Sequence, residues 1–418
     1  MSDNSVTSIC VIIGASHAGA SCAFALRSEG WLGRIIIYDT DAELPYHRPP
    51  LSKTYLTAEQ EIASSPLKSA ESYEREDITL KLGIRVSSID RNKKRIYLKD
   101  GATQTYDKLV LATGARPIIP PVSGLEDAQS VFALRTLADV EGIRKALGNN
   151  AATKKVVVIG GGYIGLEIAA SLTKLGSKVT VLERQKRILE RVTSVEMSNF
   201  FSNLHTENRV RIATGKNVTS VEQKDIDQNV ICSDGSAYPA DIILIGVGIY
   251  VNQELAEKAG IVIGNGIKVD GSSKTSDTNI YAIGDCTNHH NPHYDKAVRL
   301  ESVQNAVDQA KVAAAAICGK EAIYDAIPWF WSDQYDVKLQ IVGLSEGYDN
   351  YIVRQEEKEG HCFSIWYFNG DKLLSVDAVN NAKAYVLGTR FIKTGQLIDK
   401  EKLANSTEAF KPANLVVA

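Results

Sequence analysis

The sequence predicts an α/β fold in which two Rossmann-like dinucleotide-binding domains are combined with a small α+β domain. Three observations support this prediction. A unit made of a strand, a glycine-rich turn, a helix and a second strand that ends in an acidic residue occurs twice. Two further apolar strands lead into glycine-containing segments at comparable places after each unit. From about residue 323, short strands and a hairpin signal replace this pattern.

The first unit lies near the N-terminal end of the sequence. An apolar run at residues 9–13 predicts a strand, residues 14–19 (GASHAG) a tight turn, and the stretch to about residue 29 a helix. A second strand at residues 35–38 ends at Asp39. Glycines in such a turn let the backbone approach a pyrophosphate, whose charge lies at the helix N-terminus. The acid at the strand end accepts hydrogen bonds from a ribose diol.

The second unit fits the G-x-G-x-x-G pattern fully. Residues 156–159 predict the strand, 160–165 (GGGYIG) the turn, and a helix follows to about residue 174. The strand at residues 179–182 ends at Glu183. One such pattern is weak evidence for a nucleotide site, but two complete copies in one chain argue against coincidence.

The first unit departs from the pattern at one position and is ambiguous at another. Ser16 stands where the second unit has its middle glycine, Gly162. Serine is small, so the sequence still predicts a close approach of the backbone to a phosphate. The acid is ambiguous because Asp39, Thr40 and Asp41 all lie at the strand end.

Later strands complete the two nucleotide-binding domains. The apolar runs at residues 109–111 and 242–245 each predict the strand that returns the chain from one domain to the next. Residues 278–285 predict an apolar strand that ends in Gly-Asp. A plain turn explains this dipeptide in isolation. At a strand end in a chain with two nucleotide units, we expect Asp285 to reach a ribityl hydroxyl.

The C-terminal part of the sequence has no nucleotide motif. Its apolar runs predict short strands, with Asn369, Gly370 and Asp371 as a hairpin turn, and one helix. The strands are expected at residues 337–342, 351–353, 363–368 and 373–376, and the helix at residues 380–394.

Composition limits the possible classes of function. The 418 residues exceed what one hydrophobic core supports, and 44% hydrophobic with 23% charged residues is ordinary for a globular protein. A net charge of −3 gives no basic field for nucleic acid or an anionic membrane. No apolar run reaches the roughly 20 residues that span a bilayer, and no signal-peptide pattern is visible. We therefore expect a cytoplasmic protein that binds neither nucleic acid nor membrane.

The cysteines and histidines predict no metal site. None of the six cysteines forms C-x-x-C, and we expect buried, reduced thiols. Cys22, near the first glycine-rich turn, has no partner at a spacing that suits a redox-active disulfide. His289, His290 and His293 form a cluster without acids or cysteines at ligand spacing, so we expect them to be loop residues.

With these motifs placed, the sequence resembles the FAD-dependent NADH:ferredoxin reductases of bacterial oxygenase systems, of the putidaredoxin-reductase type. The resemblance extends over nearly the whole chain. Residues 48–53 (RPPLSK) and 328–334 (PWFWSDQ) are its most selective markers. The runs 112–117 (ATGARP), 160–167 (GGGYIGLE) and 282–286 (AIGDC) complete the set, and many flavoprotein disulfide reductases share the glycine-rich turns.

The resemblance implies a pyridine nucleotide-disulfide reductase-like fold with three domains. Residues 1–117 and 246–322 would form the FAD-binding domain, residues 118–245 the NADH-binding domain, and residues 323–418 the C-terminal α+β domain. It also implies a set of residues that contact FAD. These are Gly14, Ala18, Gly19, Asp39, Thr40, Arg48, Lys53, Val86, Arg116, Arg135, Asp285 and Val303.

The predicted nicotinamide nucleotide is NADH. The charge of Glu183 favours a free ribose diol and repels a 2′-phosphate. Arg184, Lys186 and Arg187 could cradle a phosphate, although a solvated basic segment is the simpler interpretation. The residues expected to contact NADH are Gly160, Gly162, Tyr163, Ile164, Gly165, Glu183 and Gly248.

The resemblance further implies which residues lie nearest the chemistry. Lys53 and Glu167 resemble a pair beside the flavin and the nicotinamide, while an ordinary surface glutamate is the alternative for Glu167. Trp331 resembles an aromatic residue near the exposed flavin edge, where the acceptor docks. Hydride would pass from NADH to FAD, and single electrons would then pass to a [2Fe–2S] ferredoxin without a cysteine relay.

The ferredoxin would feed an oxygenase of aromatic hydrocarbon catabolism, either a haem-thiolate monooxygenase or a Rieske ring-hydroxylating dioxygenase. Lys68, Lys311 and Lys338 are candidates for steering an acidic ferredoxin. Two alternatives stay open: a reductase of another acceptor, such as a quinone, rubredoxin, monodehydroascorbate or oxygen, and a redox-sensing flavoprotein like apoptosis-inducing factor. No coiled coil or interface stripe is visible, and we expect a monomer or a weak homodimer.

Overall fold

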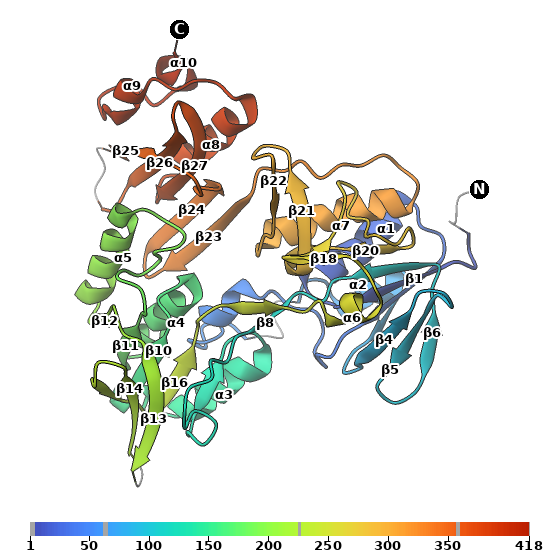
Figure 1. The fold of residues 1–418 in the computed structure, drawn as a ribbon, viewed down its shortest axis with the longest axis horizontal. Helices are drawn as coiled ribbons and strands as arrows, with labels where there is room; N and C mark the ends of the chain where they lie inside the picture. The colour runs from blue at the N-terminus through green and yellow to red at the C-terminus, as the bar shows by residue number, and fades with distance from the viewer. Residues whose placement is uncertain (1–4, 62–65, 225–226, 357–359, 418) are drawn as a thin grey trace. The chain divides into compact units, whose positions relative to one another are not determined.

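A computed structural model describes residues 5–61, 66–224, 227–356 and 360–417 (Figure 1). The chain divides into two compact units. The first unit contains residues 5–47, 66–116 and 251–330, and the second contains residues 48–61 and the described residues of 117–250 and 331–417. Strands β8 (Ala115–Pro117) and β17 (Ile249–Val251) lie where the chain passes between the units.

The first unit is built on a parallel sheet with the strand order β20-β7-β1-β2-β3. Its central strand β1 is apolar throughout, which suits a strand that is covered on both faces. The strands are β1 (Ile9–Ile13), β2 (Arg34–Tyr38), β3 (Ile78–Lys81), β7 (Lys108–Leu111) and β20 (Ile280–Ala282).

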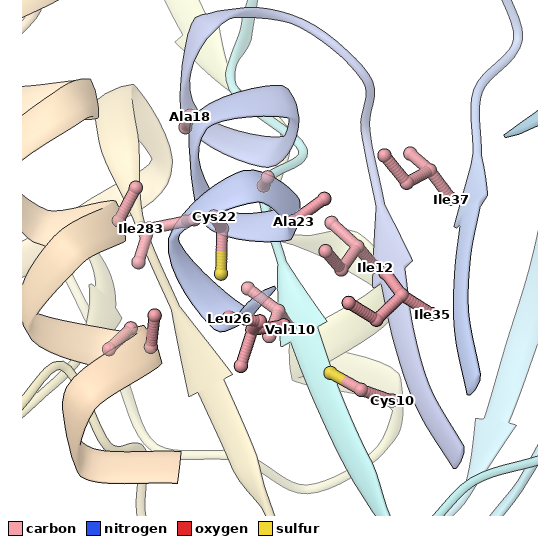
Figure 2. Close-up of a cluster of buried hydrophobic side chains, with 14 of the residues drawn as sticks. Cys10, Ile12, Ala18, Cys22, Ala23, Leu26, Ile35, Ile37, Val110 and Ile283 are labelled. Atoms are coloured by element: carbon pink, nitrogen blue, oxygen red, sulfur yellow. The ribbon is translucent and has the colours of Figure 1, made fainter. Parts of the chain in front are cut away.

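Two helices, α1 (His17–Glu29) and α7 (Val303–Ile317), cover one face of this sheet. Figure 2 shows side chains of α1, among them Ala23 and Leu26, clustered with strand side chains such as Ile12 and Val110. Half of the buried residues of α7 are alanines, and these small side chains let the two helices pack closely.

The opposite face of the sheet packs against an antiparallel sheet, β4-β5-β6, and a short helix, α6. A further sheet in the same unit has the order β18-β19-β21-β22. The bounds are α2 (Ala70–Arg75), β4 (Val86–Asp90), β5 (Arg95–Leu98), β6 (Thr103–Thr105), α6 (Glu254–Lys258), β18 (Ile263–Gly264), β19 (Gly266–Lys268), β21 (Thr287–Asn291) and β22 (Lys296–Val298).

The second unit contains another parallel sheet, with the order β12-β11-β10-β16-β9. An antiparallel sheet, β13-β14-β15, packs on it through one shared hydrophobic core. The bounds are β9 (Val131–Ala133), α3 (Leu137–Leu147), β10 (Lys155–Ile159), α4 (Tyr163–Lys174), β11 (Lys178–Leu182), α5 (Val195–Glu207), β12 (Arg211–Ala213), β13 (Val218–Lys224), β14 (Asp227–Cys232), β15 (Ala237–Pro239) and β16 (Ile242–Ile245).

The C-terminal part of the chain forms a sheet with the order β23-β24-β27-β26-β25. Helix α8 begins after Asn381, whose side chain accepts a hydrogen bond from Ala384 N. The bounds are β23 (Trp329–Gln334), β24 (Val337–Gly343), β25 (Asn350–Gln355), β26 (Phe363–Asn369), β27 (Lys372–Val379), α8 (Ala382–Thr394), α9 (Lys400–Ala404) and α10 (Pro412–Leu415).

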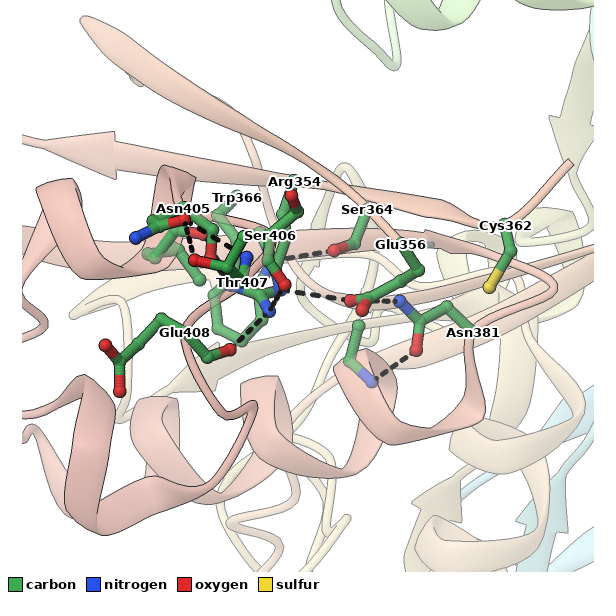
Figure 3. Close-up of polar contacts among 12 residues, drawn as sticks. Arg354, Glu356, Cys362, Ser364, Trp366, Asn381, Asn405, Ser406, Thr407 and Glu408 are labelled. Atoms are coloured by element: carbon green, nitrogen blue, oxygen red, sulfur yellow. Dashed lines mark hydrogen bonds and ion pairs between the residues drawn. The ribbon is translucent and has the colours of Figure 1, made fainter. Parts of the chain in front are cut away.

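A buried arginine holds helix α9 and the segment after it against this sheet. Arg354 on β25 is 1% exposed, and its guanidinium donates to the carbonyl groups of Leu403, Asn405 and Glu408 at 2.8–3.0 Å (Figure 3). Its Nε donates to Glu356 Oε1 at 3.0 Å. A charge buried to this extent requires such a full set of acceptors, so Arg354 stabilises the segment that follows α9.

The predicted fold class is confirmed, because each nucleotide unit of the sequence forms a parallel sheet with a helix after its glycine-rich turn. The division into three domains stays a prediction, since the stretches 118–245 and 323–418 fall mainly in one compact unit. The expected strand at 278–285 is shorter and ends at Ala282 before a 3₁₀ turn, Gly284–Cys286. Among the described helices, none combines the length and the apolarity that a membrane span needs.

Candidate functional site

The two glycine-rich turns have the same backbone geometry. In each, the N–H of the first glycine donates to the last residue of the unit's second strand at 2.8 Å. Gly14 has a φ of 107° and Gly160 a φ of 112°, a region that favours glycine. A Cβ would lie 2.1 Å from Ala112 O at the first position and 2.3 Å from Gly246 O at the second. Both positions therefore require glycine.

The last glycine of each turn lets the helix approach the turn closely. A Cβ on Gly19 would lie 1.8 Å from Gly14 O, and a Cβ on Gly165 would lie 2.3 Å from Gly160 O. The backbone of α1 and of α4 therefore passes directly against its own turn, which brings the helix N-terminus to the place expected for a pyrophosphate.

The middle position of the turn explains why serine is accepted in the first unit. Ser16 has φ −74° and ψ −162°, and Gly162 has φ −83° and ψ 176°, which is extended backbone in both cases. A Cβ on Gly162 would meet no atom within 4 Å. This side of the turn faces open space beside the N-terminus of α4, so the residues present fit a dinucleotide pyrophosphate.

The strand-end acids occupy equivalent positions in the two units. Asp39 Oδ2 accepts from Ala15 N at 2.5 Å, and Glu183 Oε2 accepts from Gly161 N at 2.7 Å. Asp41 instead accepts from the Tyr46 hydroxyl. Asp39 is therefore the counterpart of Glu183, which resolves the ambiguity in the sequence. Each carboxylate oxygen keeps acceptor capacity for a ribose hydroxyl.

The other residues predicted to contact NADH lie at one edge of the second parallel sheet. Tyr163 and Ile164 open helix α4, where Ile164 is half exposed. Gly248 follows the neighbouring strand β16 and has a φ of 124°. The carboxyl ends of parallel strands are where nucleotides bind in sheets of this type. Contact with NADH stays a prediction for all of them.

The basic residues after Glu183 do not act as one group. The Arg187 guanidinium donates to Ser194 O at 3.0 Å and to Ser198 Oγ at 2.6 Å, so it holds the start of α5. Arg184 and Lys186 are exposed. This arrangement favours a solvated basic segment over a phosphate cradle.

Lys53 and Glu167 form an ion pair within the second unit. Lys53 Nζ lies 2.6 Å from Glu167 Oε2, and the two side chains are 20% and 5% exposed. Glu167 also accepts from Ser52 Oγ at 2.6 Å through Oε2 and from Ser332 Oγ at 2.7 Å through Oε1. A carboxylate buried to this extent needs such partners. Glu167 is thus not an ordinary surface glutamate.

The segment that carries Lys53 is fixed to helix α4. Pro49 and Pro50 start a 3₁₀ turn, and Lys53 follows its last residue, Ser52. Ser171 lies one helical turn after Glu167 on α4, and its hydroxyl donates to Ser52 O at 2.7 Å. The Lys53 ammonium is therefore held on a rigid support.

The residues predicted to contact FAD are divided between the units. The first unit holds Gly14, Ala18, Gly19, Asp39, Thr40, Val86, Arg116, Asp285 and Val303, and the second holds Arg48, Lys53 and Arg135. Their contact with FAD stays a prediction.

The Gly-Asp turn is held between helices α1 and α7 of the first unit. Gly284 has a φ of 79°, and a Cβ there would lie 3.0 Å from the Cβ of Ala18. Gly284 N donates to Gln309 Oε1 at 2.8 Å. A Cβ on Gly284 would also lie 3.8 Å from the Cβ of Ala306, so the residue before Asp285 packs against the first turn of α7, which begins at Val303.

Protein partners orient two of the three predicted arginines, Arg116 and Arg48. Arg116 donates to Asn252 Oδ1 and lies within 2.7 Å of Glu254 Oε1. In the second unit, Arg48 Nη1 donates to the carbonyl of Arg135 at 2.5 Å. Val86 is buried in the core of the first unit, so its side chain packs inside the protein.

The thiols of the first unit are poor candidates for an electron relay. Cys22 is fully buried, and burial raises its pKa to about 12. Cys10 lies in the same hydrophobic core (Figure 2), and burial raises its pKa as well. Neither thiol forms a disulfide. A thiol in such an environment does not become a thiolate near neutral pH.

The prediction of loop residues was wrong for two of the three clustered histidines, whereas His293 lies in a turn as expected. His289 and His290 lie on β21, which pairs with β22. His289 is buried and its Nδ1 lies 3.3 Å from Gln309 Nε2, whereas His293 Nε2 lies 2.7 Å from Asp325 O. In the described part of the chain, no group of three or more histidine, cysteine or acidic side chains is arranged to hold a metal.

The lysines proposed to steer an acidic partner are exposed but differ in their surroundings. Lys311 lies 3.3 Å from Asp308, which offsets its charge. The Lys68 ammonium lies 5.3 Å from the ring centre of Phe24. The exposed Lys338 is in the second unit. The steering role stays a prediction.

Sequence reasoning missed a buried acid of the second unit. Asp377 on β27 is 1% exposed, and it accepts from the hydroxyls of Tyr367 and Thr193 at 2.6 and 2.7 Å. Burial raises its pKa from 3.8 to about 6. Strand β27 has no alternation of exposed and buried residues that could mark Asp377 as an inward-facing acid, because nearly every residue of this strand is buried.

Asp377 is expected to make stability depend on pH. Because its pKa is higher in the folded protein, its stabilising contribution is complete below the unfolded value of 3.8 and is lost as pH rises through about 6. Asp377→Asn mimics the protonated acid. Its free energy of unfolding, relative to the parent protein, should rise by about 2 kcal/mol between about pH 4 and about pH 7. Urea unfolding of both proteins measures this difference, and a difference that does not change with pH would contradict the assignment.

Comparisons with known proteins agree with this architecture. Residues 8–310 match the pyridine nucleotide-disulphide oxidoreductase family, and residues 329–413 match a family described as reductase C-terminal. The chain is 44% identical to putidaredoxin reductase CamA of Pseudomonas putida over 375 residues, which are 88% of each protein. It is 40% identical to rhodocoxin reductase of Rhodococcus erythropolis, over 95% of this chain and 92% of that protein.

A solved structure is similar over almost the whole chain. The crystal structure of the covalent putidaredoxin reductase–putidaredoxin complex gives a TM-score of 0.92 at 40% identity. The match covers 97% of this chain and 98% of that one.

Proposed function

The chain belongs to the pyridine nucleotide-disulphide oxidoreductase family, and from its two nucleotide turns and its relatives we propose that it is an FAD-dependent NADH:ferredoxin reductase. When bound, FAD supplies the chemistry, because it can accept a hydride and release the two electrons one at a time. The contribution of the protein is to bind, orient and shield the reacting groups.

The duplicated nucleotide turn is the observation that carries this proposal. Two turns of the same geometry, each with its own strand-end acid, support two dinucleotides in one chain. We assign FAD to Gly14–Gly19 and Asp39, and NADH to the turn that begins at Gly160 and to Glu183. In domain terms, residues 1–117 and 246–322 would bind FAD, 118–245 NADH, and 323–418 would form the C-terminal domain.

The residues nearest the chemistry would act by position and charge. The Lys53 ammonium, fixed by Glu167, would present a positive charge beside the flavin. Trp331 on β23 would lie at the acceptor side. The buried, protonated thiol of Cys22 supports transfer to the acceptor without a cysteine relay.

The proposed acceptor is a small [2Fe–2S] ferredoxin that feeds an oxygenase. The names of the relatives, reductases of putidaredoxin and rhodocoxin, support this class of partner. Whether the oxygenase is of the haem-thiolate or the Rieske type stays a prediction, as do the cytoplasmic location and the oligomeric state.

Reduction of cytochrome c by NADH tests the acceptor. We expect the rate to increase at least about tenfold when a [2Fe–2S] ferredoxin is added to the holoenzyme, because the ferredoxin carries single electrons between the two proteins. Equal rates with and without ferredoxin, or faster turnover with a quinone or rubredoxin, would contradict the proposal. A slow reaction that leaves the flavin reduced for long periods would instead favour a redox sensor.

The same assay with NADPH tests the nucleotide. Both oxygens of Glu183 accept backbone N–H groups at 2.7 Å, so its charge is fixed at the place expected for a 2′-phosphate. We expect kcat/KM for NADH to exceed that for NADPH by about tenfold or more. A ratio near or below one would contradict the assignment of NADH.

A further inference from the structure

A series of hydrogen bonds runs from Glu167 along strand β23 to helix α5 within the second unit. Ser332 Oγ lies 2.7 Å from Glu167 Oε1, and Gln334 Nε2 lies 3.2 Å from Ser332 Oγ. Gln334 Oε1 lies 2.8 Å from Nε2 of His205, whose Nδ1 lies 3.0 Å from the Tyr335 hydroxyl. Four hydrogen bonds thus connect five side chains.

The direction of each hydrogen bond follows from the groups involved. A carboxylate only accepts, so Ser332 donates its single proton to Glu167 and accepts from the Gln334 amide. The Gln334 oxygen only accepts, which places a proton on Nε2 of His205. Burial lowers the pKa of His205 to about 4, so the ring is neutral at pH 7 and its Nδ1 accepts from Tyr335. In each of the four hydrogen bonds, therefore, the acceptor is the group nearer to Glu167 along the series.

Burial makes each of these hydrogen bonds costly to lose. Ser332 and His205 are 0% exposed and Gln334 is 1% exposed, so water cannot replace a missing partner. Strand alternation places Ser332 and Gln334 on one face of β23 and Trp331 on the other. The strand that carries Trp331 is thus attached by its buried face to α4 and α5.

We propose that Ser332 and Gln334 are positioning residues for the reaction: they orient the Glu167 carboxylate, and through it the Lys53 ammonium, and they fix the strand that carries Trp331. This role rests on the proposed function, because it concerns the transfer of hydride from NADH. The proposed role explains why two residues on the buried face of β23, Ser332 and Gln334, are polar.

Serine substitutions test the role. Ser332→Ala removes the donor to Glu167, and we expect reduction of the flavin by NADH, followed by stopped flow, to slow about tenfold while the Kd for NADH changes less than about twofold. Ser332→Thr keeps the hydroxyl and should restore the rate to within about threefold of the parent protein. A role in packing alone would make threonine at least as harmful as alanine.

Ser375 provides a matched control in the same unit. It is also 0% exposed, and its hydroxyl donates to Val342 O at 2.9 Å, away from the series. Ser375→Ala should cost similar stability in urea unfolding and leave the flavin reduction rate unchanged. An equal loss of rate in both alanine variants would overturn the positioning role.

Nitrogen NMR of the histidines gives a readout that does not depend on turnover. We expect His205 to be the neutral Nε2–H tautomer at pH 7, and its ring signals to shift in Ser332→Ala although Gln334 separates the two residues. Gln334→Met should change the His205 signals more and the reduction rate less than Ser332→Ala. An Nδ1–H tautomer of His205, or ring signals that are the same in Ser332→Ala and in the parent protein, would overturn the proposed direction of the hydrogen bonds.

The two proposals fail in different ways. Flavin reduction is measured without ferredoxin, so the result does not depend on whether ferredoxin is the correct acceptor. If NADH does not reduce the flavin of the parent protein, the proposed function falls and the positioning role falls with it. If the parent protein is reduced normally and Ser332→Ala is reduced at the same rate, only the positioning role is overturned.

Discussion

Replacing Lys53 with methionine is expected to slow reduction of the flavin by NADH about a hundredfold and to destabilise the protein. Methionine keeps the apolar length of the side chain and removes the ammonium. Glu167 would then remain as a carboxylate that is 5% exposed, with hydroxyl donors but no opposite charge. Breaking a buried pair in this way costs about 3–5 kcal/mol. Stopped-flow reduction and urea unfolding measure the two effects.

A double variant separates the two effects. In Lys53→Met combined with Glu167→Gln, the amide can accept from Ser332 and donate to Ser52, so no buried charge is left unpaired. We expect the double variant to recover most of the lost stability but none of the lost rate. Recovery of the rate would mean that Lys53 serves only to neutralise Glu167. A single variant with normal rate and stability would remove the pair from the mechanism.

The nucleotide units could be predicted from the sequence because their requirements are local. Gly14 and Gly19 are needed by a turn of a few residues, and the same holds for Gly160 and Gly165. The departure at Ser16 has a physical explanation that only backbone angles supply, since that position is extended and needs no glycine. The choice between Asp39 and Asp41 likewise required the hydrogen bond to Ala15.

The surroundings of the ion pair could not be predicted, because its partners are distant along the chain. Glu167 and Ser332 are separated by 165 positions, and His205 and Gln334 by 129. The resemblance supplied Lys53, Glu167 and Trp331, but no pattern of spacing connects a serine and a glutamine on one strand with a histidine on a helix. The alternation Ser332–Gln334 within the 328–334 run was the one available signal.

The error at His289 and His290 has a similar cause. A run of polar residues predicts a loop when its neighbours are unknown. In the fold, β19 and β22 pair with this segment, and His289 is buried with Gln309 as a partner. Long-range pairing therefore overrides the local preference. The antiparallel sheets β4-β5-β6 and β13-β14-β15 escaped prediction because their strands mix polar and apolar residues.

Replacing Gly14 with alanine is expected to abolish binding of FAD and to destabilise the first unit by about 3 kcal/mol or more. The φ of 107° is strained for any residue with a Cβ. The new Cβ would also lie 2.1 Å from the carbonyl oxygen of Ala112, which belongs to the backbone after β7 and cannot rotate away. Relief requires the turn to move from the N-terminus of α1, where the pyrophosphate is proposed to bind. FAD content after purification and urea unfolding measure the outcome.

Ser16→Gly is the matched control in the same turn. It recreates the glycine of the second unit at a position whose backbone is already extended, so we expect a change of about 0.5 kcal/mol or less and full FAD content. If Gly14→Ala bound FAD as tightly as Ser16→Gly, the turn would not be the phosphate site and the assignment of FAD to the first unit would be wrong. If Gly14→Ala lost FAD without loss of stability, the turn would have moved to make room for the Cβ. Binding of the pyrophosphate would then depend on the position of the turn and not on the stability of the fold. Comparing the FAD content and the free energy of unfolding of the two variants thus shows whether FAD is lost because its binding space is altered or because the fold is strained.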